Sequence, residues 1–138
     1  MATELKLKLQ EGDQAPDFSA ATNGSGRVSL ADFKGKQVIL YFYPRDDTPG
    51  CTQEACGFRD HFAVFKKRGA VVLGVSVDPV KAHDKFVTKF KLPFPLLADD
   101  DKKIVNDYGV WGPKSFMGRK YEGIHRVTFL IGPDGKIK

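Results

Sequence analysis

The sequence has no run approaching the ~20 consecutive apolar residues that a membrane-spanning helix needs. Residues 1–8 alternate apolar and charged side chains, so they lack the continuous apolar core of a secretion signal. We therefore expect no membrane association and a cytoplasmic location, where thiols stay reduced. Only two of the 138 residues are cysteines. In that compartment a cysteine pair is more often catalytic or metal-binding than a structural disulfide.

Internal repeats and low-complexity tracts are also missing, which predicts a single domain over residues 1–138. The formal net charge of +5 raises the question of nucleic-acid binding. However, the lysines are spread along the chain. The densest clusters, 66–68 and 102–103, are not interleaved with aromatic residues. We interpret them as solvated helix ends and expect no nucleic-acid partner.

Apolar patterning predicts alternating strands and helices. Buried strands are expected at 37–43 and 70–77, and a helix at 51–67 with one apolar stripe. A second helix should run to residue 90, with Asp78 as N-cap and Pro79 at its first position. The remaining expectations follow in chain order: an N-terminal hairpin of 17–21 and 28–30, an extended edge or strand start at 94–97, a helix at 100–108, a loop at 109–123, a strand at 127–131 and a last strand from Lys136.

This order predicts an α/β fold whose central mixed sheet has helices on both faces. Apart from a terminal helix, it matches the core order of a thioredoxin-like fold. The sequence stops at Lys138, where that helix would be expected. The expectation is therefore a domain truncated at its C-terminus, with one sheet face partly uncovered.

Cys51 follows a Thr48-Pro49-Gly50 turn at the point where a predicted strand gives way to a helix. Thr48 can cap that helix, and Gly50 lets the backbone approach a ligand closely. Unpaired N–H groups and the positive end of the helix dipole would point at the Cys51 sulfur. Both favour the thiolate, which is the nucleophilic form. The alternative is a small buried apolar residue.

Cys56 lies five positions after Cys51. In a regular helix this spacing puts the two Cα atoms roughly 8 to 9 Å apart, beyond the about 7 Å that a disulfide tolerates. A bond between the two would therefore require at least one turn to uncoil. Gly57 weakens the helix at that point. The alternative for Cys56 is a core residue beside Phe58.

Other cysteine chemistries fit less well. The three histidines are scattered, and with two cysteines at this spacing they match no usual zinc-ligand pattern. The spacing is also not the Cys-x-x-Cys of disulfide oxidoreductases.

Residues 42–52, Phe-Tyr-Pro-Arg-Asp-Asp-Thr-Pro-Gly-Cys-Thr, closely resemble the active-site signature of peroxiredoxins. The continuation 54–60, Glu-Ala-Cys-Gly-Phe-Arg-Asp, resembles the bacterioferritin comigratory protein (peroxiredoxin Q) subfamily. Further similarity follows in the right order over nearly the whole chain, at 12–18, 74–76, 109–112, 123–126 and 128–131.

The resemblance implies reduction of hydrogen peroxide and organic hydroperoxides by thiol chemistry, without metal, flavin or other cofactor. Cys51 matches the cysteine that attacks the peroxide and becomes a sulfenic acid. Cys56 matches the one that resolves it into an intramolecular disulfide, which thioredoxin reduces. Pro44, Thr48 and Arg126 match the remaining active-site residues of the family.

Each of these roles has a physical basis. The Arg126 fork can hold both the thiolate and a peroxide oxygen. The Thr48 hydroxyl can bond the sulfur or the peroxide, and Pro44 can shield the thiolate from water. An intramolecular resolving cysteine makes a dimer unnecessary, so we expect a monomer. Two alternatives remain: a peroxide sensor that passes its disulfide to a partner protein, and a binding module with idle cysteines.

Overall fold

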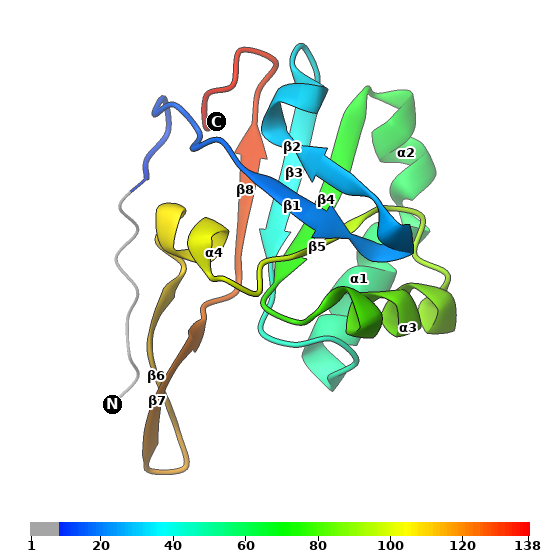
Figure 1. The fold of residues 1–138 in the computed structure, drawn as a ribbon. Helices are drawn as coiled ribbons and strands as arrows, with labels where there is room; N and C mark the ends of the chain where they lie inside the picture. The colour runs from blue at the N-terminus through cyan, green and yellow to red at the C-terminus, as the bar shows by residue number, and fades with distance from the viewer. Residues whose placement is uncertain (1–8) are drawn as a thin grey trace.

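A six-stranded mixed sheet forms the centre of the structure, a computed structural model that describes residues 9–138 (Figure 1). Its strand order is β2-β1-β5-β4-β3-β8. The strands β3, β4 and β5 run parallel, whereas β8, β1 and β2 pair antiparallel. Their bounds are β1 Ser19–Thr22, β2 Arg27–Ser29, β3 Gln37–Phe42, β4 Ala70–Ser76, β5 Leu96–Ala98 and β8 Val127–Ile131.

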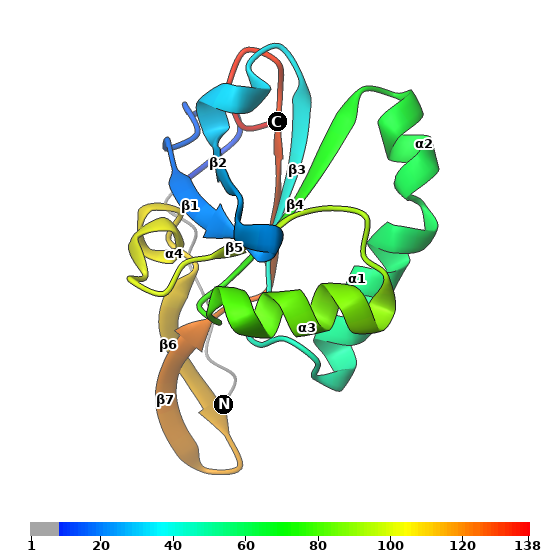
Figure 2. The same cartoon turned by 45° about the vertical axis from the view of Figure 1, so that its right-hand side comes forward.

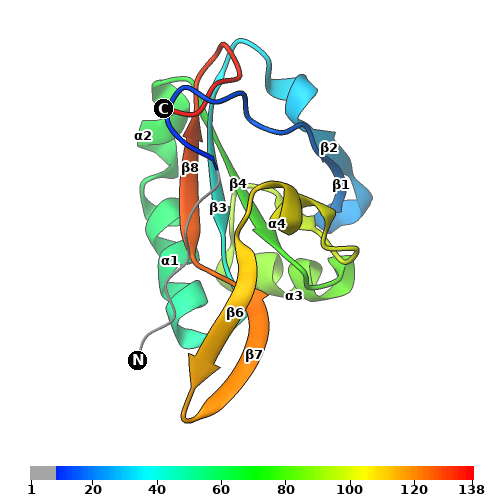
Figure 3. The same cartoon turned by 90° about the vertical axis from the view of Figure 1, so that its left-hand side faces the viewer.

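Helices lie on both faces of this sheet, as predicted. The helices α1 (Pro49–Asp60), α2 (Phe62–Lys67) and α3 (Val80–Phe90) pack on one face, and α4 (Lys103–Asp107) packs on the other. The side view separates α1 and α2 from α4 across the sheet (Figure 3). The thioredoxin-like α/β fold is thus confirmed. Every helix within residues 9–138 is too short or too polar to span a bilayer.

Alternation along β3 builds one apolar cluster on each face. Val38, Leu40 and Phe42 point toward α4, while Tyr41 and Tyr43 point toward α1 and α3. All five side chains are buried. The strand that carries the Cys51 turn is therefore fixed from both sides. At the edge strand β8, Leu130 is 41% exposed.

The N-terminal hairpin is confirmed: β1 and β2 pair antiparallel around the 3₁₀ turn Asn23–Ser25. A second 3₁₀ turn, Leu30–Phe33, follows β2. The segment at 94–97 begins a strand directly after Pro95, as one alternative had it. It is not an edge, because β5 lies between β1 and β4.

Three smaller local predictions are wrong. The predicted helix 51–67 breaks at His61, whose backbone leaves the helical region. Pro79 rather than Asp78 caps α3, because the Asp78 carboxylate instead accepts hydrogen bonds from the backbone N–H of Asp46 and the Ser76 hydroxyl. No strand begins at Lys136; within the described residues this segment makes only isolated bridges.

The largest error concerns the predicted loop at 109–123. It is a β-hairpin made of β6 (Trp111–Phe116) and β7 (Arg119–Ile124), and it projects from the body of the molecule (Figure 2). Met117 and Gly118 form its two-residue turn, and both have positive φ angles. That conformation suits the twist of a hairpin. Pro113 and three glycines hid the strand pattern in the sequence.

Candidate active site

Cys51 lies in the first turn of α1, as predicted. Thr48 is the N-cap and Pro49 the first helical residue. The Cys51 side chain is buried, with 1% of its surface exposed. A β-carbon at Gly50 would lie 3.3 Å from Nη2 of Arg126, tighter than an ordinary contact. Glycine at position 50 therefore lets the guanidinium come close to the helix start.

Arg126 brings a positive charge to the sulfur. Its Nη2 donates to Cys51 Sγ at 3.2 Å, and its Nη1 donates to Glu54 Oε1 at 2.8 Å. Partial burial alone would lower the pKa of Arg126, but its bonds to Cys51 and Glu54 outweigh that and raise it. The guanidinium is charged at every physiological pH. A negative charge on the sulfur is consequently met by the Arg126 ion. The sulfur also belongs to a residue in the first helical turn, where backbone N–H groups have no partner within the helix.

The β6–β7 hairpin holds Arg126 in place. The connector between β7 and β8 carries Arg126. Three bonds tie His125 of this connector and the last residue of β7 to β6 and to the residue before it. Lys114 Nζ donates to the Ile124 carbonyl at 2.7 Å, and His125 Nε2 donates to the Pro113 carbonyl at 2.9 Å. The His125 backbone N–H donates to the Val110 carbonyl at 2.8 Å. Burial and the nearby Arg126 charge lower the pKa of Lys114, although the Cys51 sulfur opposes this.

Thr48 and Pro44 both lie just before the helix that carries Cys51. The Thr48 hydroxyl donates to the Arg45 carbonyl at 2.9 Å rather than to sulfur, and it makes no side-chain cap bond to α1. Pro44 is half-buried at the end of the β3 segment. Both residues lie in the loop that leads from β3 into Cys51.

Cys56 lies in the same unbroken helix as Cys51, and both thiols are free. It is half-buried, two residues before Phe58. Since α1 is helical from Pro49 through Asp60, the roughly 8 to 9 Å between the two Cα atoms applies to this structure. The two sulfurs lie in one helix but are not in position to bond.

Two residues that the sequence did not single out complete the site. Glu54 faces Arg126 from one turn further along α1, and burial raises the pKa of its carboxyl although the Arg126 bond opposes this. Tyr41 is fully buried, and among the described residues its hydroxyl has no hydrogen-bond partner. Burial raises its pKa, and the nearby Glu54 carboxylate adds to this. The i+3 spacing of Glu54 from Cys51 was the only sequence signal for either residue.

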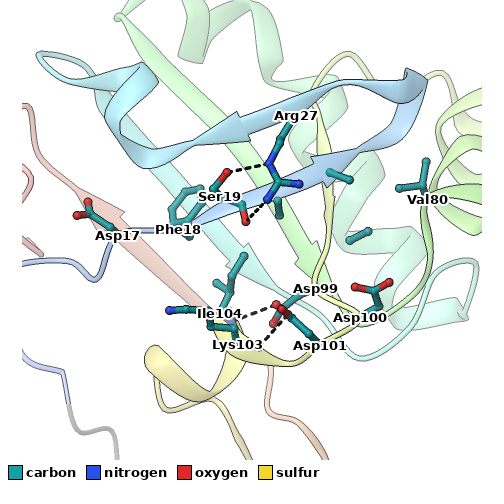
Figure 4. A pocket seen from close by; sticks show the side chains of 13 residues that line it. Asp17, Phe18, Ser19, Arg27, Val80, Asp99, Asp100, Asp101, Lys103 and Ile104 are labelled. Atoms are coloured by element: carbon teal, nitrogen blue, oxygen red, sulfur yellow. Dashed lines mark hydrogen bonds between the residues drawn. The ribbon is translucent and has the colours of Figure 1, made fainter.

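A separate pocket of about 560 Å³ lies between β1 and the start of α4 (Figure 4). Arg27 bonds Ser19 across its rim at 3.0 Å. The buried Asp99 accepts the backbone N–H groups of Ile104 and Val105, at 3.1 and 2.8 Å. This pocket is therefore built around the start of α4, and none of the residues at the Cys51 site lines it.

The AhpC/TSA family pattern matches residues 11–138. The chain belongs to this family. A putative peroxiredoxin bcp of Coxiella burnetii is 53% identical over 131 residues, which are 95% of this chain and 87% of that protein.

Among solved structures, a cysteine-to-serine mutant of Xylella fastidiosa PrxQ superposes with a TM-score of 0.88 at 36% identity. That match covers 94% of this chain and 82% of the other. The bacterioferritin comigratory protein of Xanthomonas campestris, studied for alkyl peroxide reduction, superposes with a TM-score of 0.84 at 36% identity. This match covers 96% of this chain and 84% of the other. The predicted peroxiredoxin family and its bacterioferritin comigratory protein subfamily are confirmed.

Proposed function

We propose that this peroxiredoxin is a thioredoxin-dependent thiol peroxidase for hydrogen peroxide and organic hydroperoxides. The observation that carries the proposal is the 3.2 Å bond from Arg126 to the sulfur of a cysteine in the first turn of a helix. The relatives named above support a peroxide substrate, because they are named as peroxiredoxins and one was studied for alkyl peroxide reduction.

In the first step the Cys51 thiolate attacks one peroxide oxygen. An S–O bond forms while the O–O bond breaks, so that the sulfur is oxidised to a sulfenic acid and the peroxide is reduced to an alcohol or water. The leaving oxygen takes a proton from solvent. Arg126 already bonds the sulfur and would stabilise the developing negative charge, and the unpaired N–H groups of the first helical turn would add to this. Pro44 and Thr48 would limit water and orient the peroxide from the loop before Cys51.

In the second step Cys56 resolves the sulfenic acid. Its sulfur attacks Cys51 Sγ, an S–S bond forms, and the hydroxyl leaves as water. The two cysteines lie in one intact helix, so α1 must first uncoil by at least one turn. We infer a cycle in which the reduced site is helical and the oxidised site is locally uncoiled.

In the third step a dithiol such as that of thioredoxin reduces the disulfide and becomes a disulfide itself. All three steps stay within one chain and its reductant, which fits a cytoplasmic monomer without cofactor. The cellular role would be antioxidant defence and redox homeostasis.

Intact mass spectrometry after one equivalent of peroxide tests the cycle. We expect a loss of two hydrogens within one chain, and no reaction in Cys51→Ser. Turnover with thioredoxin, its reductase and NADPH should then follow. Stoichiometric oxidation without turnover would favour the peroxide sensor, and unchanged peroxide consumption in Cys51→Ser would contradict the proposal.

A further inference from the structure

A buried polar cluster joins the active-site loop to the helix α3. His83 of α3 has no exposed surface, and its Nδ1 lies 2.6 Å from Oδ2 of Asp46 in the loop. The other oxygen of Asp46 accepts the Tyr43 hydroxyl at 2.5 Å. Asp46 lies midway between Pro44 and Thr48, five residues before Cys51. The cluster therefore acts on the segment that leads into the reactive cysteine.

The hydrogen-bond partners fix how many protons the pair holds. His83 Nε2 lies 2.9 Å from the Leu97 carbonyl oxygen, which can only accept, so Nε2 carries a hydrogen. One further proton must then lie between Nδ1 and Asp46. The pair is either imidazolium with carboxylate or neutral imidazole with carboxylic acid, and it is uncharged overall in both forms. An uncharged, fully bonded pair is what a buried site accommodates.

A second anchor holds the backbone of the same residue. The N–H of Asp46 donates to Asp78 Oδ2 at 2.8 Å, and the Ser76 hydroxyl donates to that same oxygen at 2.8 Å. Asp78 lies in the short connector between β4 and α3. Both the side chain and the backbone of Asp46 are thus bonded to elements outside α1.

We propose that Asp46 and His83 form a positioning pair that holds the active-site loop in place and limits how readily the start of α1 uncoils. This rests on the proposed cycle, in which the folded site reacts with peroxide and the uncoiled site forms the disulfide. With the loop anchored at Asp46, Cys51 stays beside Arg126. Once the anchor is lost, the loop and the first turn of α1 are free to leave together.

An exposed link between the same two elements provides a matched control. Lys89 of α3 bonds Asp47 of the loop at 2.8 Å, with 60% and 46% of the two side chains exposed. Exposed ion pairs contribute little to the stability of the folded state, whereas leaving a buried polar group unpaired destabilises it strongly. If position in the loop were all that mattered, loss of either link would change the two reaction rates alike. If burial decides, only loss of the Asp46–His83 link will change them.

The test follows two rates by rapid quench and mass spectrometry: oxidation of Cys51 by hydrogen peroxide, and conversion of its sulfenic acid to the disulfide. Asp46→Ala leaves His83 unpaired. The equilibrium between the folded and the uncoiled start of α1 should then shift toward the uncoiled form by a factor of about 5 to 100. Disulfide formation should then be at least about fivefold faster, while oxidation of Cys51 becomes slower. A loss of stability unrelated to the loop would not move the two rates in opposite directions.

Asp46→Asn should restore both rates to within about twofold of wild type. Its amide can donate to a neutral His83, and its carbonyl can accept from Tyr43. Lys89→Met should also stay within about twofold. Tyr43→Phe deletes a single hydrogen bond to Asp46. It should change both rates in the same directions as Asp46→Ala, but by smaller factors. This variant tests the proposal even if Asp46→Ala does not fold.

Unchanged rates in Asp46→Ala and Tyr43→Phe, or a fall in both rates, would overturn the positioning role. So would an Asp46→Asn as defective as the alanine variant. These outcomes are separate from failure of the proposed cycle, in which the wild-type protein itself would form no disulfide within one chain.

Discussion

The two cysteines share one helix and five positions of sequence, yet their surroundings differ. Cys51 is buried in the first turn, with an arginine N–H on its sulfur. Cys56 is half-buried in the middle of α1. The first-turn N–H groups of a helix have no partner within it, whereas those further along are already bonded. Place in the helix and the Arg126 bond therefore give the Cys51 sulfur surroundings that Cys56 does not share.

The difference also separates the two steps of the proposed cycle. Arg126 acts on a folded helix, and the disulfide needs an uncoiled one. A residue that stabilises the folded start of α1 should help the first step and slow the second. The following variants test that division.

Replacing Cys56 should have the largest effect on turnover while leaving the first step intact. In Cys56→Ser we expect one peroxide to be reduced at the wild-type rate, and turnover with thioredoxin to fall to background. Mass spectrometry should show a sulfenic acid that a small thiol can rescue. Peroxide should slightly lower the helical circular dichroism of wild type but not of this variant. Full thioredoxin-supported turnover in Cys56→Ser would contradict the resolving role.

Replacing Arg126 should instead slow the first step, the oxidation of Cys51. Arg126→Met removes the preorganised donor, and we expect oxidation of Cys51 to slow by about 10² to 10³-fold. Arg126→Lys should be intermediate, since an ammonium lacks the planar fork that reaches both Cys51 and Glu54. Competition against a second peroxidase for hydrogen peroxide measures the oxidation rate of Cys51 in both variants. A methionine variant within threefold of wild type would remove Arg126 from the mechanism.

Local signals in the sequence were enough for the strand β3, for the start of α1 and for the position of Cys51. A run rich in Val, Ile and aromatic residues, followed by Thr48, Pro49 and Gly50, specifies the strand, the helix start and the place of Cys51 within about a dozen residues. The whole fold class followed from the order of such segments. By contrast, Pro113 and the glycines of the β6–β7 hairpin obscured its strand pattern, and Met117 is not a usual residue of a tight hairpin turn, so this hairpin was missed.

Contacts between distant residues could not be derived from spacing. Arg126 is 75 residues from Cys51, and only resemblance to the peroxiredoxins suggested it. Lys114 and the pairing of Asp46 with His83, 37 residues apart, left no signal in the sequence. They depend on where the hairpin projects and on how α3 crosses the sheet. Thr48 was placed correctly, but the direction of its hydroxyl was set by the Arg45 carbonyl.

Gly57 offers a smaller and more selective change. It is helical and exposed, and a β-carbon there would meet nothing within 4 Å. Alanine should therefore stabilise the helix by about 0.5 to 1 kcal/mol. The uncoiled fraction, and with it the rate of disulfide formation, should fall about two- to fivefold. Oxidation of Cys51 serves as the internal control and should not change. Equal disulfide rates in Gly57→Ala and wild type would mean that uncoiling at this turn does not limit the second step.

Glu54 gives the smallest effect, visible through pH. Burial raises the pKa of Glu54, and the Arg126 bond only partly opposes this. The folded protein thus holds this proton more tightly than the unfolded chain does. The stability that it contributes is present in full below the unfolded pKa and is lost as the pH rises through the folded value.

Glu54→Gln has no such titration. Its unfolding free energy should therefore improve relative to wild type as the pH is raised from about 4 to about 8. Urea unfolding at each pH measures the difference. In an Arg126→Met background the improvement should be larger, because the opposing positive charge is gone. If wild type instead gains on Glu54→Gln as the pH rises, attraction to Arg126 outweighs burial. Glu54 would then stabilise the charged cluster around Cys51, whereas a raised pKa means that folding keeps this carboxylate at a cost.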